Sequence, residues 1–215
     1  MANEEQVALL KQGSEVWNAW KKKNPETDID LSNADLKSAN LSAAYLPCAN
    51  FRSANLSCAN LSCANLSYAD LDSTDLKFAN LSYADLSGAS ISYTDLSYAD
   101  LRSANLRLAD LSYSNLSQAD LKSADLKSSN LSDTDFSLAD LSNANLSLAD
   151  LSNAELFSAH LRSANLSFTD LSEAKVLRTN FTKAIFTGAC IAAWHMDSLT
   201  ILEDVTCDYI FRTYD

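Results

Sequence analysis

The hydrophobic residues between Leu31 and Ile191 recur with a period of five. Every fifth residue is Leu, Phe, Ile or Val without interruption, and the residue two places earlier is nearly always Ala, Ser or Thr. A step of five in an α-helix turns about 140°, so successive leucines would share no face. In a strand, an odd step sends every second Leu to the opposite face. The pattern therefore predicts a solenoid that turns once per unit, with Leu and the small residue inward.

The unit reads (Ala/Ser/Thr)-(Asp/Asn)-(Leu/Phe)-(Ser/Thr/Arg)-X, as in Ala69-Asp70-Leu71, and it resembles the motif of the pentapeptide-repeat family. It covers about three quarters of the chain through 33 consecutive central positions. The resemblance implies an all-β fold, a right-handed quadrilateral β-helix with four units in each coil. We therefore expect about eight coils stacked over about 39 Å across residues 30–192.

The first 29 residues lack this period and predict a capping helix followed by a linker. An apolar stripe at helical spacing includes Trp17 and Trp20, Gly13 lies inside the expected helix, and Asn24-Pro25 ends it. We expect this helix to cover the leucines of the first coil, in preference to binding a membrane or a partner. The segment Trp17-Asn18-Ala19-Trp20, with Asp30-Leu31, looks most like cyanobacterial members of the family that carry such a cap.

Residues 193–215 are rich in apolar side chains without the five-residue period, and we expect an irregular cap there. Trp194, Ile210 and Phe211 are candidate cap residues, and the run from Cys207 to Phe211 favours one last strand. A homodimer joined through this end is the second interpretation, because the resembled family includes members joined in this way. Monomer and C-terminal homodimer both stay open.

Apolar side chains at the fifth position of the unit form columns if residues 20 apart stack. Stacked rings stabilise neighbouring layers, and clustered exposed aromatics also favour a partner-binding face. The two interpretations are equally supported by the pattern. The columns are Phe78, Tyr98 and Leu138; Tyr93 and Tyr113; and Tyr68, Leu108, Leu148 and Phe168.

The outward positions are strongly acidic, and the chain has a net charge of −12. Asp and Asn interchange just before the central residue, which indicates a side chain that hydrogen-bonds the local backbone rather than a metal ligand. A small basic band lies beside one acidic column, Asp100, Asp120 and Asp140, which His160 follows. We expect the band to balance charge, with an acidic-peptide contact as the lesser alternative. The band consists of Arg102, Arg107, Lys122, Lys127 and Arg162.

The sequence contains no recognisable catalytic or metal-binding arrangement. His160 and His195 have no ligand partners at a known metal spacing, and there is no Gly-x-Ser-x-Gly or glycine-rich phosphate loop. Cys48, Cys58 and Cys63 would fall on three faces of a four-sided coil, and an odd total of five cysteines fits a reducing compartment. We expect no enzymatic activity, no cofactor and no metal.

These features favour a protein–protein interaction scaffold whose partner the sequence does not identify. The alternative comes from the resemblance: some pentapeptide-repeat proteins mimic DNA and inhibit a type II topoisomerase, gyrase. The acidic charge fits that role, whereas the neutral Asn residues and the basic band weaken it. Direct nucleic-acid binding is not expected from so acidic a chain. Without a signal-like start or a long apolar run, we expect a cytoplasmic protein with no membrane segment.

Overall fold

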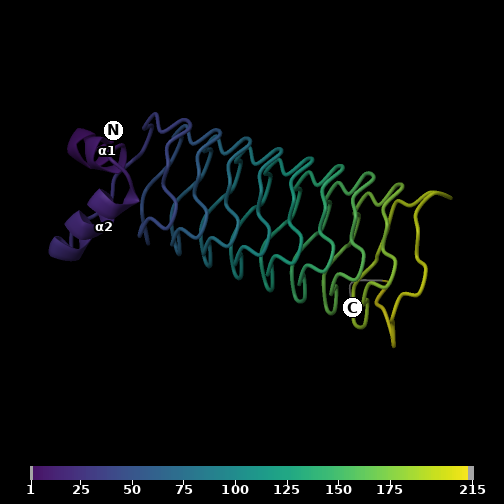
Figure 1. The fold of residues 1–215 in the computed structure, drawn as a ribbon. Coiled ribbons are helices and arrows are strands. Elements are labelled where there is room, and N and C mark those ends of the chain that lie inside the picture. The colour runs from purple at the N-terminus through teal and green to yellow at the C-terminus, as the bar shows by residue number, and fades with distance from the viewer. Residues whose placement is uncertain (1, 213–215) are drawn as a thin grey trace.

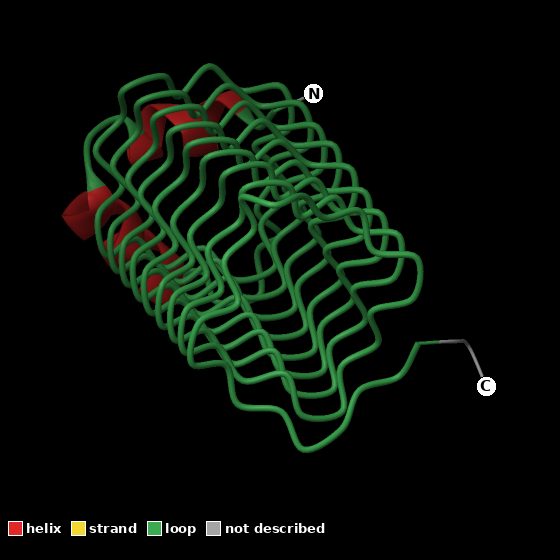
Figure 2. Ribbon diagram, turned by 90° about the vertical axis from the view of Figure 1, so that its right-hand side faces the viewer, coloured by secondary structure: helices red, strands yellow, loops and turns green. Residues whose placement is uncertain are grey.

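The computed structural model describes residues 2–212 and shows two short helices at one end of a stack of similar coils (Figure 1). Helix α1 spans Glu4–Leu10 and helix α2 spans Ser14–Lys23. The coils that follow appear as nested outlines when the stack is turned by 90°, so that its C-terminal end faces the viewer (Figure 2). Their β pairing consists of single-residue parallel bridges within the described residues.

The register of these bridges defines the coil. Each bridge joins residues 20 apart, from Asp30 with Asn50 to Lys175 with His195, at every fifth position of the chain. One coil therefore contains four five-residue units, as the resemblance implies. Each outward Asp or Asn lies directly between its equivalents in the two neighbouring coils.

Each unit contains one tight turn that makes the corner. The backbone N–H of the small residue donates to the carbonyl of the central residue three places earlier, for example Ala104 to Leu101 at 3.0 Å. The fifth residue of every unit from Asn33 to Ala193 has a positive φ of 51° to 77°. A positive φ at the third position of a turn is the geometry of a type II turn. Tyr, Leu and Ser adopt it here as regularly as Gly does.

All five backbone N–H groups of a typical unit find an acceptor. In residues 101–105, three of them donate to carbonyls of the adjacent coils, one closes the turn, and one donates to a side-chain oxygen of Asp100. The N···O distances are 2.7, 3.1, 3.0, 3.0 and 2.9 Å in chain order. This complete pairing replaces the continuous ladder of an ordinary sheet.

The Asp or Asn before the central residue supplies that side-chain acceptor. Its Oδ1 accepts from the backbone N–H two residues later, at 2.9 Å from Asp150 to Ser152 and 3.0 Å from Asn165 to Ser167. Asp and Asn offer the same oxygen, which explains why the two residues interchange in the sequence. Most of the acidic side chains are therefore occupied by the fold.

The core of the coils is formed by the central residues and the small residues that precede them. The central leucines, such as Leu101 and Leu121, are inaccessible to solvent. Buried hydroxyls replace some alanines, and six of them donate to the carbonyl of a central residue in the preceding coil at 2.6 to 2.9 Å, which satisfies each hydroxyl without a side-chain partner. These residues are Thr74, Thr94, Ser114, Thr134, Thr169 and Thr179.

The N-terminal cap differs from the single helix that the sequence predicts. Gly13 has φ +108° and is the N-cap residue just before α2, so the expected helix is broken there into α1 and α2. Trp17 is fully buried, and its indole N–H donates to the carbonyl of Tyr45 at 2.8 Å. Trp20 lies partly buried beside it, with ring centroids 5.0 Å apart. A glycine with positive φ can end one helix and orient the next, which the hydrophobic stripe alone did not reveal.

Two side-chain carboxamides of the N-terminal cap form the backbone hydrogen bonds that a preceding coil would otherwise form with the first coil. Gln6 accepts from the N–H of Asp30 at 2.9 Å and donates to the carbonyl of Asp28 at 2.7 Å. Asn18 accepts from the N–H of Tyr45 at 2.8 Å and donates to the carbonyl of Ala43 at 2.9 Å. A side-chain carboxamide thus pairs with the exposed edge as a backbone peptide group would, and these two sides of the first coil are closed.

The C-terminal tail is more regular than the sequence predicts. Ile201, Thr206 and Phe211 pair with the residues 21 positions earlier, so one inserted residue follows His195 and the coil then continues. Phe211 donates to Ala189 at 2.8 Å and forms a single bridge with Cys190, so the run from Cys207 to Phe211 ends in one bridge and not in a continuous strand. The inserted residue masks the period in the sequence. The tail therefore adds a coil, and most of its apolar side chains are exposed rather than buried as a lid.

The inward and outward assignments predict unequal effects of two substitutions in one unit. Replacing buried Leu101 with Ala leaves a cavity between two coils, and we expect it to lower the free energy of unfolding by about 2 to 5 kcal/mol. Replacing exposed Ser103 with Ala in the same unit should change it by less than about 0.5 kcal/mol. Denaturant unfolding followed by circular dichroism measures both values. Similar losses for the two variants would contradict the packing described.

Candidate interaction surfaces

The predicted aromatic columns exist, but they lie at three successive corners of the coil and do not form one face. Phe78 stacks on Tyr98 with ring centroids 4.8 Å apart, and Tyr93 stacks on Tyr113 at 5.0 Å with nearly parallel rings. The column that begins at Tyr68 occupies the corner diagonally opposite Phe78, since the two are two units apart in a four-unit coil. All members are exposed: Tyr68, Phe78, Tyr93, Tyr98, Leu108, Tyr113, Leu138, Leu148 and Phe168.

A glycine follows the aromatic ring at two places in the Tyr68 column, at Gly88 and at Gly188, whereas Ser128 fills the remaining gap. A Cβ at Gly88 would lie 2.6 Å from the Tyr68 ring, and a Cβ at Gly188 would lie 2.6 Å from the ring of Phe168. Each ring therefore lies over a glycine of the next coil, which leaves room for it. In the Phe78 column the gap is filled by Gln118, whose amide donates to the Tyr98 hydroxyl at 2.7 Å.

Three further exposed aromatics of the described residues were not singled out by the sequence patterns, namely Tyr45, Tyr83 and Phe157. Tyr83 occupies the fourth corner at the same position of its unit, so the fifth-position rule was sufficient to find it. Phe157 stands one place earlier in its unit, and the guanidinium of Arg178 lies 5.6 Å from its ring centroid. Lys77 makes the same kind of contact at 5.6 Å from Phe78 and 5.8 Å from Tyr98.

The basic band is largely neutralised by the acidic columns beside it. Arg102 binds Asp100 through two hydrogen bonds of 2.8 and 2.6 Å, and Lys122 bridges Asp120 and Asp140 at 3.1 and 3.0 Å. These side chains are about half exposed, so their main effect is to reduce repulsion between stacked carboxylates.

The remaining members of the band are less uniformly paired. Arg107 pairs with Asp125 at 3.2 Å. Lys127 and Arg162 form no ion pair with the described residues, and His160 Nδ1 lies 4.0 Å from Asp140. Three of the five members of the band thus balance charge, as the sequence predicts.

These contacts shift the ionisation of the paired groups. Hydrogen bonding from Arg102 is the main cause that holds the pKa of Asp100 below its usual range, and Asp100 in turn raises the pKa of Arg102. Asp140 is the main cause that raises the pKa of Lys122. For Asp140, burial opposes ionisation, but hydrogen bonds from Ser142 and Lys122 outweigh it and lower its pKa. Each pair is therefore stabilised in its charged form.

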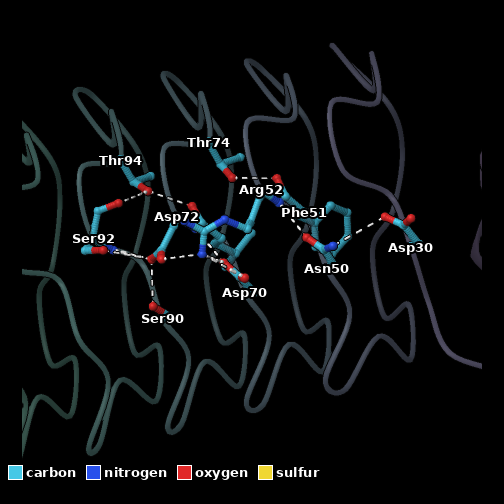
Figure 3. Close-up of polar contacts among 11 residues, drawn as sticks. Asp30, Asn50, Phe51, Arg52, Asp70, Asp72, Thr74, Ser90, Ser92 and Thr94 are labelled. Carbon is cyan, nitrogen blue, oxygen red and sulfur yellow. Dashed lines mark hydrogen bonds and ion pairs between the residues drawn. The ribbon is translucent and has the colours of Figure 1, made fainter. Parts of the chain in front are cut away.

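A second polar network supplies the hydrogen-bond acceptor in a unit that lacks the usual Asp or Asn (Figure 3). Ser90 stands where that residue is expected, and Asp72 of the preceding coil reaches across to serve instead. Its Oδ1 accepts from the Ser92 backbone at 3.1 Å and from the hydroxyls of Ser90 and Ser92 at 2.6 and 2.8 Å. Arg52 pairs with Asp72 at 2.9 Å and with Asp70 at 3.1 Å. The network satisfies backbone groups and shows no feature of a catalytic site.

No cluster of potential metal ligands was found among residues 2–212. Cys48, Cys58 and Cys63 are exposed on three different corners, and all five cysteines are free. In the described part of the chain, no helix has the length and apolar character needed to cross a bilayer.

The C-terminal end of the stack carries an apolar hollow of about 190 Å³. Trp194 is half-buried in its floor, stacked on Phe181 at 5.5 Å and edge-on to Phe186 at 5.7 Å. Its indole nitrogen is buried and has no hydrogen-bond partner among the described residues. Ile210 also lines the hollow, whereas Phe211 is exposed with its ring edge-on to Tyr209.

The family model of pentapeptide repeats matches this chain in eight copies between residues 30 and 192. The chain belongs to the pentapeptide-repeat family. The right-handed β-helix of that family agrees with the coils of four units and the 20-residue register. No curated protein sequence matches the chain.

Several solved pentapeptide-repeat proteins are similar in structure. HetL of the cyanobacterium Nostoc, involved in the regulation of heterocyst differentiation, is 29% identical over 87% of this chain and 92% of that one, with a TM-score of 0.36. A protein of the Arabidopsis thaliana thylakoid lumen is 32% identical, but the match spans 41% of this chain and 61% of that one, with a TM-score of 0.40.

A trypsin-treated form of QnrB1, a plasmid-mediated fluoroquinolone resistance protein, has a TM-score of 0.50. It is 19% identical over 83% of this chain and 86% of that one. This likeness concerns the fold alone.

The Asp72 network predicts an acid-dependent loss of stability. Replacing Asp72 with Ala leaves the Ser92 N–H without its acceptor and should lower the free energy of unfolding by about 1 to 3 kcal/mol at neutral pH. Burial raises the pKa of Asp72, but the hydrogen bonds from Ser90 and Ser92 outweigh it, so the folded pKa lies below the ordinary value of 3.8. The stabilisation is therefore complete above 3.8 and is lost as the pH falls through the folded pKa.

Urea unfolding across this pH range measures that difference. Asp110 to Asn is the matched control. Its amide oxygen can still accept from the Ser112 N–H, as in the units that contain Asn, so this substitution should change the free energy of unfolding by less than about 0.5 kcal/mol. A pH-independent difference between the wild type and Asp72 to Ala would show that the carboxylate charge contributes nothing.

Tyr68 and Gly88 should be energetically coupled. Gly88 to Ala should cost about 1 to 2 kcal/mol, because Ala is strained at φ +65° and its Cβ displaces the ring. In a Tyr68 to Ser background the steric part disappears, so the same change should cost at least about 0.5 kcal/mol less. A double-mutant cycle of unfolding free energies measures this coupling, and equal costs in both backgrounds would refute it.

Proposed function

We propose that the chain is a non-enzymatic scaffold that binds another protein through side chains at the corners of its coils. The observation that supports it most is how few side chains the fold leaves free. Leucines and small residues fill the core, and most Asp and Asn oxygens complete backbone turns. Exposed aromatic residues at the corners have no such duty in pairing the backbone, and aromatics are enriched in protein interfaces.

The proposal divides the chain into three parts. Residues 1–29 cap one end and residues 30–192 form the rigid β-helix. Residues 193–215 are the C-terminal segment, of which 213–215 lie outside the described residues, and its exposed apolar side chains up to Phe211 supply a surface for either a partner or a second copy of the chain. Light scattering after size-exclusion chromatography distinguishes the last two, since a second copy requires a dimer at high protein concentration.

A DNA mimic that inhibits gyrase is the alternative function. Unpaired carboxylates stacked in one column, such as Asp75 and Asp95, favour it because they repeat along the rod as backbone phosphates do. The ion-paired band at Arg102 and Lys122 interrupts that negative surface. A supercoiling assay with purified gyrase tests the alternative, and it requires inhibition at micromolar protein.

Affinity capture tests the scaffold directly. The wild type and a Tyr98 to Ser, Tyr113 to Ser variant are immobilised and exposed to extract of the native cell. Removing one ring from each stacked pair should reduce the amount of a specific partner severalfold, since interface aromatics carry much of the binding energy.

The matched control is Tyr83 to Ser, which removes a more exposed ring, outside the stacked pairs, at the fourth corner. It should leave capture unchanged. If no specific protein binds the wild type, or if both variants bind as the wild type does, the corner surfaces are not the binding site.

A further inference from the structure

The stacked pair Tyr93 and Tyr113 differs from the stacked pair Phe78 and Tyr98 in one respect. At the Phe78 corner, the ammonium of Lys77 lies 5.6 and 5.8 Å from the two ring centroids. Lys77 is the residue just before Phe78 in its unit. At the Tyr93 corner the equivalent residue is Ser92, whose hydroxyl binds Asp72 instead. Two similar aromatic platforms therefore exist, and the chain itself supplies a cation to only one of them.

The Tyr93 corner is also surrounded by carboxylates. Asp110 and Asp95 stand on the two sides that meet at this corner, Asp133 follows Tyr113 directly in the column, and Asp135 stands beside it in the same coil. None of the four forms an ion pair with the described residues, unlike Asp100, Asp120 and Asp140 in the basic band. The negative charge of Asp133 is the main cause that raises the pKa of Tyr113.

We propose that the Tyr93 and Tyr113 corner binds an Arg or Lys side chain of a basic segment in a partner protein. The rings attract a cation through their faces, and the flanking carboxylates supply the opposite charge. Lys77 shows that this coil geometry holds a cation within 5.8 Å of both ring centroids of a stacked pair. The inference rests on the proposed scaffold function and specifies the chemistry of its partner.

Binding of a basic peptide tests the site separately from the scaffold. The probe is a short fluorescein-labelled peptide of alternating Arg and Ser, followed by fluorescence anisotropy at near-physiological salt. The full-length variant with Tyr93 to Ser and Tyr113 to Ser should bind it about threefold to tenfold more weakly than the wild type. The variant with Phe78 to Ser and Tyr98 to Ser should bind as the wild type does, because Lys77 already occupies that pair.

A second pair of variants leaves both rings in place. Ser92 to Lys introduces an ammonium at the position equivalent to Lys77 and should weaken peptide binding to a similar extent. Ser142 to Lys makes the same change of net charge within the column of Arg102 and Lys122 and should leave binding nearly unchanged. Long-range attraction to the acidic rod would instead affect these two variants equally.

Equal weakening by the two ring variants, or by the two lysine variants, would overturn the inference. So would unchanged binding in both the Tyr93 variant and the Ser92 variant. These outcomes differ from a failure of the scaffold itself. A specific protein that is captured equally by the wild type and by the Tyr93 and Tyr113 variant would support the scaffold and exclude this cation site.

Discussion

The structure depends on the pairing of the backbone in each five-residue turn. A turn at every corner requires a positive φ once per unit, which costs an L-residue about 1 kcal/mol or more. The same turn lets three N–H groups pair with adjacent coils, a fourth close the corner, and a fifth bind the Asp or Asn side chain. It also directs Leu into the core. The local strain is offset because every coil repeats the same complete pairing and the same burial.

This constraint determines where function can reside. Asp72 illustrates it: when Ser90 interrupts the pattern, an acidic residue from the preceding coil supplies the missing acceptor, so even an apparent site of charge is used by the fold. The two ends contrast in the same terms. Gln6 and Asn18 pair with the backbone of the first coil, whereas the last coil leaves apolar side chains and an unpaired edge exposed. Recognition is therefore expected at corners and at the C-terminal end.

Prediction from the sequence succeeded where the same residue type has the same structural role in every unit. The period gave the solenoid, and the stacking of Phe78 on Tyr98 and of Tyr93 on Tyr113 followed once four units per coil were assumed. It failed where a single residue changes the register. Gly13 divides the N-terminal helix, and the residue inserted after His195 hides a further coil. A periodic pattern carries no information about a position that breaks it.

The sequence by itself determined the turn, the inward residues and the family, because each follows from side-chain types repeated at a fixed spacing. Only the tertiary structure decided which outward side chains remain free. Lys77 lies near a ring of its own coil and a ring of the next, and Arg52 joins its own coil to the next one. Such pairings depend on which side chains the stacked coils bring within contact distance of one another. For this reason, only the tertiary structure distinguishes the pair Tyr93 and Tyr113, which has no lysine beside it among the described residues, from the pair Phe78 and Tyr98, which has Lys77.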